Sequence, residues 1–388
     1  MTIKNQRNLF DIPEDIAYLN TASLSPSFLS IEEAGIEAIK EKSRPYVIPS
    51  SDFFEPVSQL KKQFADIIGA DDHNRIASLP SVSYGLANVA NNVTLKSTDE
   101  ILVIDEQFPS NYYIWKRLVE TYGASVKVIH QPEDRDNCGQ LWNEAILEAI
   151  NENTALVAMG QIHWANGIIF NLKAIREKTR KHDALLIVDG SQSIGALPFS
   201  VKEIQPDALV CAGYKWLFGP YGCAYGYYGP YFDDGVPIEE NWSNRLYSEN
   251  LAGLTDYQPQ YKPLASRYNV GENGSFIYVR MQSEALRQVA QFPPDIIQEY
   301  CDSISTSAIE ELVNLGFYVH KLETRAKHLF GVEIPQDLNI EALKQELAKA
   351  KIYVSFRGRY MRLSCHLFNT KHDFNRLVET VKSIMTPA

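Results

Sequence analysis

Two short apolar runs, each followed closely by a polar side chain that can take part in chemistry, constrain the fold of this chain most strongly. The runs are Ala184–Val188 and Ala208–Cys211, and they lead into Asp189 and Lys215. Both are rich in Leu, Ile and Val and too short for a helix, which favours buried strands of a mostly parallel sheet. In such sheets ligands bind outside the carboxyl ends of the strands. Asp189 and Lys215 are therefore predicted to face one crevice.

A carboxylate and a lysine in one crevice are the pair that the cofactor pyridoxal phosphate (PLP) requires. A lysine amine holds PLP as a Schiff base, and an acidic partner keeps its ring nitrogen protonated. Lys215 is the predicted Schiff-base lysine and catalytic residue, and Asp189 is the predicted partner of the ring nitrogen. If the flanking residues are ignored, a simpler interpretation is favoured, in which Asp189 caps the N-terminus of a helix and Lys215 lies on the surface in a turn.

Composition and net charge limit the classes of protein to which this chain can belong. The chain has 388 residues, 45% of them hydrophobic, which suits two domains or one large domain with a smaller appendage. The net charge of −11 and the lack of a basic stripe argue against nucleic acid as a partner. No apolar segment follows the polar start, which predicts neither a signal peptide nor a membrane span. Five scattered cysteines without CxxC spacing predict a cytoplasmic protein with no metal site.

Three short motifs resemble the core signature of the aminotransferase class V family of fold-type I PLP enzymes. They are Asp189-Gly-Ser-Gln192, Gly213-Tyr-Lys215-Trp and Gly219-Pro-Tyr-Gly222, in the family's order. The family includes cysteine desulfurases, kynureninases, epimerases and several transaminases. The resemblance implies an α/β fold with a mostly parallel seven-stranded sheet between helices, plus a smaller α+β C-terminal domain. It also implies a homodimer with active sites at the subunit interface, a large PLP-binding domain at 21–262 and a small domain formed by 1–20 and 263–388.

The sequence pattern predicts the elements of both domains. Further strands are predicted at 76–79, 100–105, 125–130, 154–160, 221–228, 351–356 and 360–364. Helices are predicted at 31–42, from 82 onward, and at 142–150, 172–181, 286–291, 295–315, 320–329 and 340–349. The segment 230–263, rich in Pro, Asp, Asn, Tyr and Gly, is predicted to be a long loop that crosses the cleft.

The phosphate group of PLP is predicted to lie at the start of the helix that opens at Val82. A helix N-terminus offers free N–H groups and a positive dipole, and Ser83 adds a hydroxyl. A plain capping serine is the alternative interpretation. In the family this place holds a small-residue turn that grips the phosphate, so the Val82 N–H and Ser83 are the implied contacts. Tyr214 replaces the family's usual histidine before the lysine and is implied to reach the phosphate with its hydroxyl, as in kynureninase-like members.

The ring of PLP needs a flat face to stack on and a donor to its ring oxygen. Phe108, in a Phe-Pro-Ser setting similar to a kynureninase-type motif, is the predicted stacking residue, with a core phenylalanine as the alternative. Gln192 is predicted to donate to the ring oxygen. The family's asparagine at this oxygen is replaced by Trp164, which implies a bulkier wall beside the substrate, and Asn166 follows two positions later.

A further contact to the phosphate is implied to come from the neighbouring subunit. The segment 267–273 resembles the family's R-F-x-x-G-T motif, but Glu272 stands where the threonine belongs, and a carboxylate repels phosphate. Asn273 or a backbone N–H is the predicted replacement.

Arg362 is predicted to bind the α-carboxylate of the substrate. Arg362-Leu-Ser-Cys-His-Leu-Phe-Asn-Thr resembles the family's R-x-S-x-x-x-Y-N-T motif, and a guanidinium holds a carboxylate through two parallel hydrogen bonds. Arg357 and Arg359 are rivals for this role. Ala22 and Ser23 resemble a family segment at the mouth of the cleft and are further substrate-binding candidates.

The loop before Arg362 lacks the cysteine that cysteine desulfurases use as a persulfide-forming nucleophile. Cys365 follows the arginine and is predicted to be a small buried residue. These features predict no persulfide relay through a loop cysteine. Transamination of an amino acid or related amine is the predicted reaction, although Phe108, Tyr214 and Trp164 resemble the kynureninase and epimerase side of the family. A PLP-dependent lyase or epimerase, similar to kynureninase or isopenicillin N epimerase, is the alternative. A catalytically silent dimeric homologue is a third reading, motivated by Glu272 and by the lost asparagine.

Overall fold

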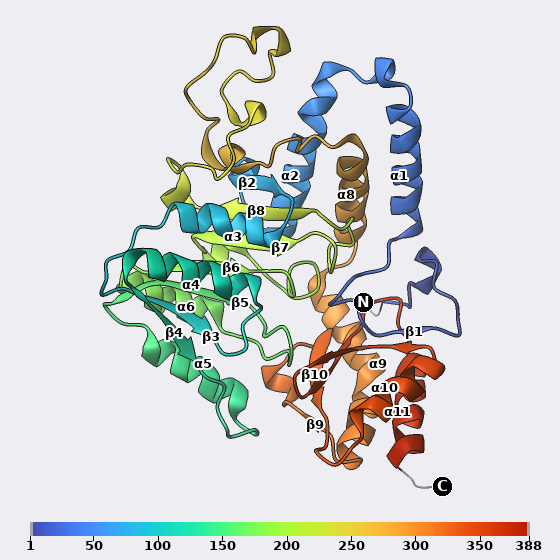
Figure 1. Cartoon of the computed structure of the whole chain (residues 1–388). Helices are drawn as coiled ribbons and strands as arrows, with labels where there is room; N and C mark the ends of the chain where they lie inside the picture. The colour runs from blue at the N-terminus through green and yellow to red at the C-terminus, as the bar shows by residue number, and fades with distance from the viewer. Residues whose placement is uncertain (1–2, 386–388) are drawn as a thin grey trace.

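A seven-stranded sheet forms the centre of the computed structural model, which describes residues 3–385 (Figure 1). The strand order is β2-β8-β7-β6-β5-β3-β4. β8 is antiparallel to both of its neighbours, and the remaining adjacent pairs are parallel, which confirms the predicted mostly parallel sheet. The bounds are β2 Ile76–Leu79, β3 Glu100–Ile104, β4 Ser125–Ile129, β5 Thr154–Gly160, β6 Leu185–Asp189, β7 Ala208–Ala212 and β8 Ala224–Tyr228.

The direction of the strands brings their carboxyl ends to one edge of the sheet. Because β8 is antiparallel to both β2 and β7, these two strands run the same way. β3, β5 and β6 are joined to β7 by parallel pairings. The segments that follow β2, β3, β5, β6 and β7 therefore all start at the same edge, which is where a ligand crevice is expected.

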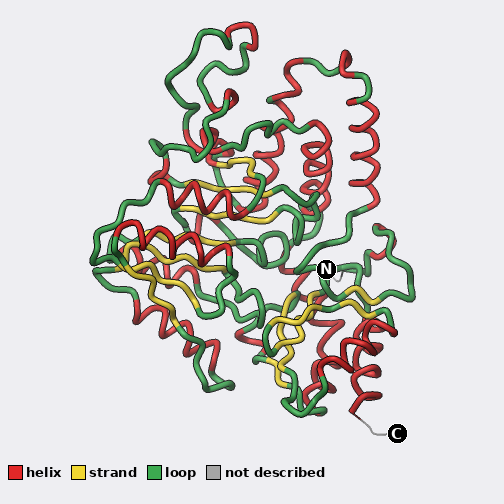
Figure 2. The backbone as a smooth tube through the Cα atoms, in the orientation of Figure 1, coloured by secondary structure: helices red, strands yellow, loops and turns green. Residues whose placement is uncertain are grey.

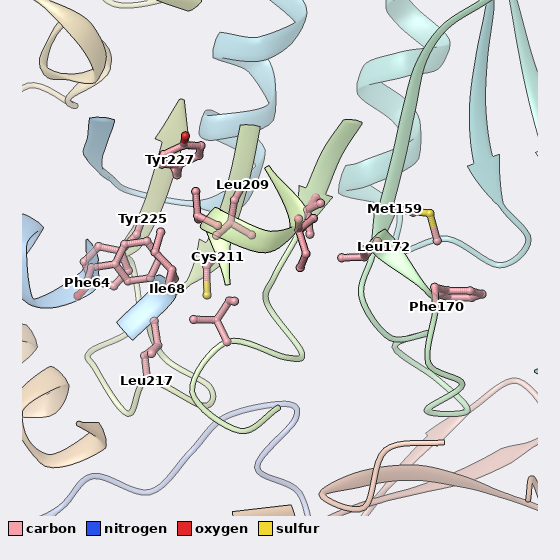
Figure 3. Packing of buried hydrophobic residues seen from close by; sticks show 14 of the residues in the cluster. Phe64, Ile68, Met159, Phe170, Leu172, Leu209, Cys211, Leu217, Tyr225 and Tyr227 are labelled. Atoms are coloured by element: carbon pink, nitrogen blue, oxygen red, sulfur yellow. The ribbon is translucent and has the colours of Figure 1, made fainter. Parts of the chain in front are cut away.

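Helices cover both faces of this sheet, because its strands alternate their side chains between two cores. In β7, Leu209 and Cys211 point to the side where α2 supplies Phe64 and Ile68, as Figure 3 shows. The intervening Val210 belongs to the core on the other face. α2 (Glu55–Ile68), α5 (Cys138–Ala149), α6 (Leu172–Lys181) and α8 (Phe276–Val289) pack on the first face, whereas α3 (Val82–Asn91) and α4 (Ser110–Tyr122) pack on the second.

A smaller α+β unit lies beside the large sheet and consists mostly of C-terminal elements, shown in orange and red in Figure 1. Its antiparallel sheet has the order β12-β13-β10-β9, and β1 pairs with β11 in a separate parallel ribbon. This arrangement confirms the predicted smaller C-terminal domain, while the boundaries 21–262 and 263–388 stay a prediction. The bounds are β1 Ala17–Tyr18, β9 Tyr318–Val319, β10 Leu329–Glu333, β11 Ile352–Tyr353, β12 Ser355–Arg357, β13 Tyr360–Ser364, α9 Pro294–Asn314, α10 Ile340–Lys349 and α11 Lys371–Met385.

The helix predicted at 320–329 is wrong. The segment holds one short 3₁₀ helix, Leu322–Thr324, and β10 already starts at Leu329. Apart from one internal bond, from the Thr324 N–H to the Lys321 carbonyl, its backbone pairs with the turn after β5: the Ala326 N–H donates to the Gly167 carbonyl, and the Thr324 carbonyl accepts from Ile169. α1 (Leu29–Lys42) lies close to its prediction, α8 starts ten residues before the predicted 286, and α2, α4 and α11 were not predicted.

The segment 230–263 is the long loop that the composition predicts. Figure 2 shows it as mostly loop, interrupted by short helical turns, of which Pro230–Phe232, Trp242–Asn244 and Leu251–Gly253 are 3₁₀ helices. Trp242 packs edge-on against Phe54, with 5.8 Å between the ring centroids. Over residues 3–385, no helix combines the length and apolar character needed to cross a membrane.

Candidate active site

A cavity of about 230 Å³ lies where the segments after β2, β3, β5, β6 and β7 converge. Residues from five separate parts of the chain therefore meet in one place, as the strand directions require. Eight of the residues predicted from the sequence line this cavity together: Val82, Ser83, Phe108, Trp164, Asp189, Gln192, Tyr214 and Lys215.

Lys215 is a buried cation in this cavity, with 8% of its surface exposed. Its ammonium forms no hydrogen bond or ion pair within the described part of the chain, and it lies 5.5 Å from the centroid of the Phe108 ring. Burial lowers the pKa of Lys215 to about 8, although Asp189 acts in the opposite direction. An amine with such a pKa is neutral in about a tenth of the molecules at pH 7, far more than an ordinary lysine, and can act as a nucleophile or a base.

Asp189 ends β6 and is fixed by the loop that follows it. Its carboxylate accepts the Ser191 N–H at 3.0 Å, and the Ser191 hydroxyl accepts the Ala212 N–H at 3.2 Å. Gly190 allows this tight turn, because a Cβ there would lie 2.5 Å from the Ile194 side chain. The loops after β6 and β7 are therefore tied together, so the positions of Asp189 and Lys215 depend on each other.

The N-terminus of α3 supplies donors to the same cavity. Ser81 is the capping residue: its hydroxyl accepts the Tyr84 N–H at 3.1 Å and lies 3.0 Å from the Ser83 hydroxyl. The Val82 and Ser83 N–H groups have no hydrogen-bond partner among the described residues. Ser81 rather than Ser83 therefore caps the helix, which leaves Ser83 and two backbone donors for an anion.

Two aromatic rings and an amide shape the middle of the cavity. The Phe108 and Trp164 rings meet edge-on with centroids 5.3 Å apart, and the Trp164 indole N–H donates to the Glu106 carbonyl at 2.7 Å. The Gln192 amide donates to the Ala22 carbonyl and accepts from the Trp216 indole, both at 3.0 Å. An amide carries two N–H donors, so Gln192 keeps one for a ligand.

Asn166 lies outside the cavity lining. It is fully buried, its side-chain oxygen accepts the Ile168 N–H at 3.0 Å, and its amide donates to Gln131 at 3.4 Å. The residue therefore shapes the turn after β5, and Trp164 alone occupies the wall where the family's asparagine is expected.

Arg362, in β13 of the smaller sheet, lies beside Trp164, with its Cζ 5.8 Å from the ring centroid, but it is not itself a lining residue of the cavity. It is 2% exposed, and its guanidinium donates to the Ser23 hydroxyl at 2.7 Å, the Ser355 hydroxyl at 3.1 Å and the Trp164 carbonyl at 3.1 Å. Burial, followed by repulsion from Arg357, lowers the pKa of Arg362 to about 9. The buried Nε of Arg362 has no partner. A buried cation in this state is stabilised by an anionic ligand.

The two rival arginines point to different places. Arg359 donates to the Tyr360 hydroxyl at 2.9 Å and lies 3.9 Å from the Glu333 carboxylate, away from the cavity. Arg357 lies over the Trp164 ring, with its Cζ 5.6 Å from the ring centroid. The structure therefore groups Arg357 with Arg362 and separates Arg359 from both.

Three predicted residues do not line the cavity: Arg362, described above, and also Ala22 and Asn273. Ala22 is buried, its N–H donates to Ser364 at 3.0 Å, and its carbonyl holds the Gln192 amide, so its contacts are with the fold. Asn273 lies in a separate pocket of about 240 Å³ and donates to the Ser243 hydroxyl at 3.1 Å. This location is compatible with its predicted role, which concerns the neighbouring subunit's phosphate.

Several residues that line the cavity were not predicted. Gln107 and Ser110 flank Phe108 in the segment after β3, where strand-end reasoning alone points to them. Gly160 ends β5, and a Cβ there would lie 2.8 Å from the Ile162 carbonyl oxygen in the turn that follows, a local contact that no sequence motif shows. The full set of unpredicted lining residues is Pro80, Ser81, Gln107, Ser110, Gly160, Ile162, Ser191, Ala212, Tyr221 and Gly222.

All five cysteines are buried. Cys365 is 0% exposed, and its sulfur lies 3.9 Å from the Lys327 carbonyl oxygen, which confirms the prediction of a small buried residue. Within residues 3–385, no cluster of three or more His, Cys, Asp or Glu side chains has the geometry to hold a metal ion.

The fold and the cavity together define an enzyme of the fold-type I PLP class. The model of the family described as aminotransferase class-V matches residues 48–377, so the chain belongs to this family. An uncharacterized aminotransferase of Bacillus subtilis (strain 168) is 25% identical over 328 residues, which are 84% of this chain and 83% of that protein.

Two solved structures share the fold over almost the whole chain. A cysteine desulfurase from Thermococcus onnurineus NA1 aligns with a TM-score of 0.84 at 18% identity, covering 99% of both chains. A lysine-to-alanine variant of C-DES, with glycine covalently linked to its PLP cofactor, aligns with a TM-score of 0.86 at 18% identity. That alignment covers 98% of this chain and 99% of the other.

The cofactor of this family is PLP, and the residues of the cavity fit it. The unpaired ammonium of Lys215 is available for a covalent bond to the cofactor's aldehyde. Asp189 could supply the acid that a pyridine nitrogen needs, and the unpartnered N–H groups at the start of α3 could supply donors for a phosphate. The donor set thus matches the three polar parts of PLP.

Proposed function

We propose that this chain is a PLP-dependent aminotransferase that acts on an amino acid or related amine, with Lys215 as the cofactor-bearing residue. The observation that carries the proposal is the buried, unpaired Lys215 ammonium in one cavity with Asp189 and the α3 N-terminus. A buried ammonium without a partner costs stability, so its retention points to a chemical use.

Each residue of the cavity has a role in this proposal. When bound, PLP withdraws electrons from the substrate's Cα. Asp189 would keep the ring nitrogen protonated, and Lys215 would act as the base that takes the proton from Cα and as the acid that returns a proton. Arg362 fixes the α-carboxylate, so that Cα stays within reach of Lys215. Phe108 and Trp164 shield the reacting atoms from water.

The phosphate contacts extend to a second copy of the chain in this proposal. Val82, Ser83 and Tyr214 bind the phosphate within one subunit, and Asn273 of the neighbouring subunit completes the set. The position of Asn273 in a pocket away from the cavity supports this division, because the residue has no role in its own subunit's site.

The test is a visible spectrum of the purified, PLP-loaded protein, repeated after addition of single amino acids. We expect a band near roughly 420 nm that one substrate bleaches and that Lys215→Ala abolishes. An oxo-acid product identifies a transaminase. A racemised amino acid identifies an epimerase, and a cleaved side chain identifies a lyase. If loading gives no band and Lys215→Ala changes nothing, the protein is a silent homologue.

A further inference from the structure

Two arginines at the substrate end of the cavity share a hydroxyl group. The Arg362 and Arg357 guanidinium groups both donate to the Ser23 hydroxyl, at 2.7 and 3.5 Å. Both also lie against the same indole, with their Cζ atoms 5.8 and 5.6 Å from the centroid of Trp164. Trp164 lines the cavity, so both guanidinium groups lie next to a residue of the cavity wall, although neither is itself among the lining residues.

Neither guanidinium has an acidic partner within the described part of the chain. The other contacts of Arg357 and Arg362 are to hydroxyl groups and backbone carbonyls, for example the Phe356 carbonyl at 2.7 Å from Arg357. By contrast, Arg359, two residues after Arg357, lies beside the Glu333 carboxylate. Two adjacent cations repel each other, and burial strengthens the repulsion because it removes the screening by water.

The pair of arginines affects the pKa values of groups at the site. Arg357 is the charged group that, after burial, lowers the pKa of Arg362, and both arginines contribute to lowering the pKa of Lys215. Both arginines therefore act electrostatically on Lys215 in the cavity, in the direction opposite to Asp189. One substrate carboxylate neutralises one guanidinium and leaves the second uncompensated.

We infer that the substrate is a dicarboxylic amino acid, with its α-carboxylate on Arg362 and its side-chain carboxylate on Arg357. This inference rests on the proposed function, because it names the substrate class of the same site. Arg357 then sets specificity, since an uncharged side chain leaves its guanidinium without a partner. Loss of a hydrogen-bonded charge pair of this kind changes affinity by about 10- to 100-fold.

Calorimetric titration of the PLP-loaded protein with ligands that lack an amine tests the inference. The ligands are succinate and its half-amide succinamate, which have nearly the same shape and differ in one carboxylate, and the longer pair glutarate and glutaramate. We expect at least one dicarboxylate to bind about 10- to 100-fold more tightly than its half-amide. Because no amine is present, the result does not depend on turnover.

Three variants assign this preference to Arg357. Arg357→Gln is expected to reduce the preference to less than about threefold, and Arg357→Lys is expected to keep most of it, because the charge remains. Arg359→Gln is the matched control and is expected to keep the full preference, since Arg359 points away. Circular dichroism checks that each variant is folded, and the wild-type preference stands as a test even if Arg357→Gln is not.

Three results would overturn the inference: equal binding of acid and half-amide by the wild type, no binding of either ligand, or an unchanged preference in Arg357→Gln. Equal binding that weakens with both ligands in Arg357→Gln would show that both arginines hold the α-carboxylate. These outcomes are separate from failure of the proposed function, which the spectrum of Lys215→Ala decides without any carboxylate ligand.

Discussion

The two ends of the cavity carry charge in opposite ways. At the cofactor end, one buried ammonium, Lys215, is balanced in part by the carboxylate of Asp189. At the substrate end, Arg357 and Arg362 lie together against the Trp164 ring and have no carboxylate partner among residues 3–385. The cofactor end thus has an acidic group near its cation, although the two form no ion pair, whereas the substrate end has no acidic group in the described part of the chain and needs a ligand to supply one. The uncompensated charges therefore indicate which end of the cavity requires an anionic ligand.

The largest effect is expected from removing the buried arginine of the substrate end. Arg362→Ala should lower kcat/KM by about 100-fold or more, because an α-carboxylate bound by a buried guanidinium loses its main partner. Steady-state kinetics with the amino acid that bleaches the visible band measures this change. Arg359→Ala, which removes an arginine that points away, is the control and should leave kcat/KM within about threefold. A loss of equal size in both variants would contradict the assignment.

The cofactor end can be tested by stability against pH in the cofactor-free protein. The folded chain holds a proton on Lys215 only up to about pH 8, whereas the unfolded chain holds it up to about 10.5. Unfolding takes up a proton in this window, so the cost of burying Lys215 is full below pH 8 and disappears as the pH rises to 10.5. Lys215→Met should therefore be more stable than the wild type by about 3 kcal/mol near pH 7, and the part of this difference that is due to charge should vanish near pH 10.5.

Denaturant unfolding of both proteins at several pH values measures this difference. The exposed Lys181→Met is the control for effects of alkaline pH that do not arise in the cavity. A difference between Lys215→Met and the wild type that stays constant from pH 7 to 10.5 would show that burial does not perturb Lys215.

Replacing Gly167 tests how tightly the turn that carries Trp164 packs against the smaller sheet. Gly167 lies in the turn after Trp164 with φ +82°, and a Cβ there would lie 2.3 Å from the Leu329 carbonyl oxygen in β10. Gly167→Ala should reduce the free energy of unfolding by about 2–4 kcal/mol, because both the backbone angle and the contact oppose it. Gly358, with φ +55° and open space around it, is the matched control. Gly358→Ala should reduce the free energy of unfolding by about 1 kcal/mol. An equal reduction in both variants would show that β10 shifts to accommodate the added Cβ at Gly167.

The smallest effect is expected at the shared hydroxyl. Ser23→Ala removes one acceptor from Arg362 and Arg357, but Ser355 still holds Arg362 at 3.1 Å. KM for the amino acid should rise about 2- to 10-fold with little change in kcat. Ser25→Ala removes a hydroxyl that donates to the Tyr214 carbonyl at the cofactor end and should leave KM unchanged. A fall in kcat without a change in KM would place Ser23 at the chemical step instead.

The cofactor end was predictable from the sequence because it depends on a local rule. Asp189, Lys215 and Phe108 each follow a buried apolar strand, and the parallel arrangement brings such positions to one edge. The start of α3 follows β2 in the same way. The motif order then pointed to particular residues, and the structure brings eight of the predicted residues into one cavity, while their roles stay predictions.

The substrate end was harder to predict from the sequence because it depends on contacts between distant segments. Arg362 meets Ser23 across more than 300 residues of sequence, and no local pattern reveals that Arg357 joins them while Arg359 turns away. The helix predicted at 320–329 failed for the same reason, since backbone groups of the turn after β5 take its hydrogen bonds. Tertiary pairing overrode a helical pattern there.

Chemical labelling of the cofactor lysine tests the central claim most directly. Borohydride reduces the bond between PLP and its lysine to a stable amine, which mass spectrometry locates after proteolysis. The sharpest rival is Lys61, which is 5% exposed and whose pKa burial lowers to about 7. We predict that the cofactor's mass lies on the peptide containing Lys215 and that Lys215→Ala abolishes it. Label on Lys61, or label that persists in Lys215→Ala, would contradict the assignment of the active site.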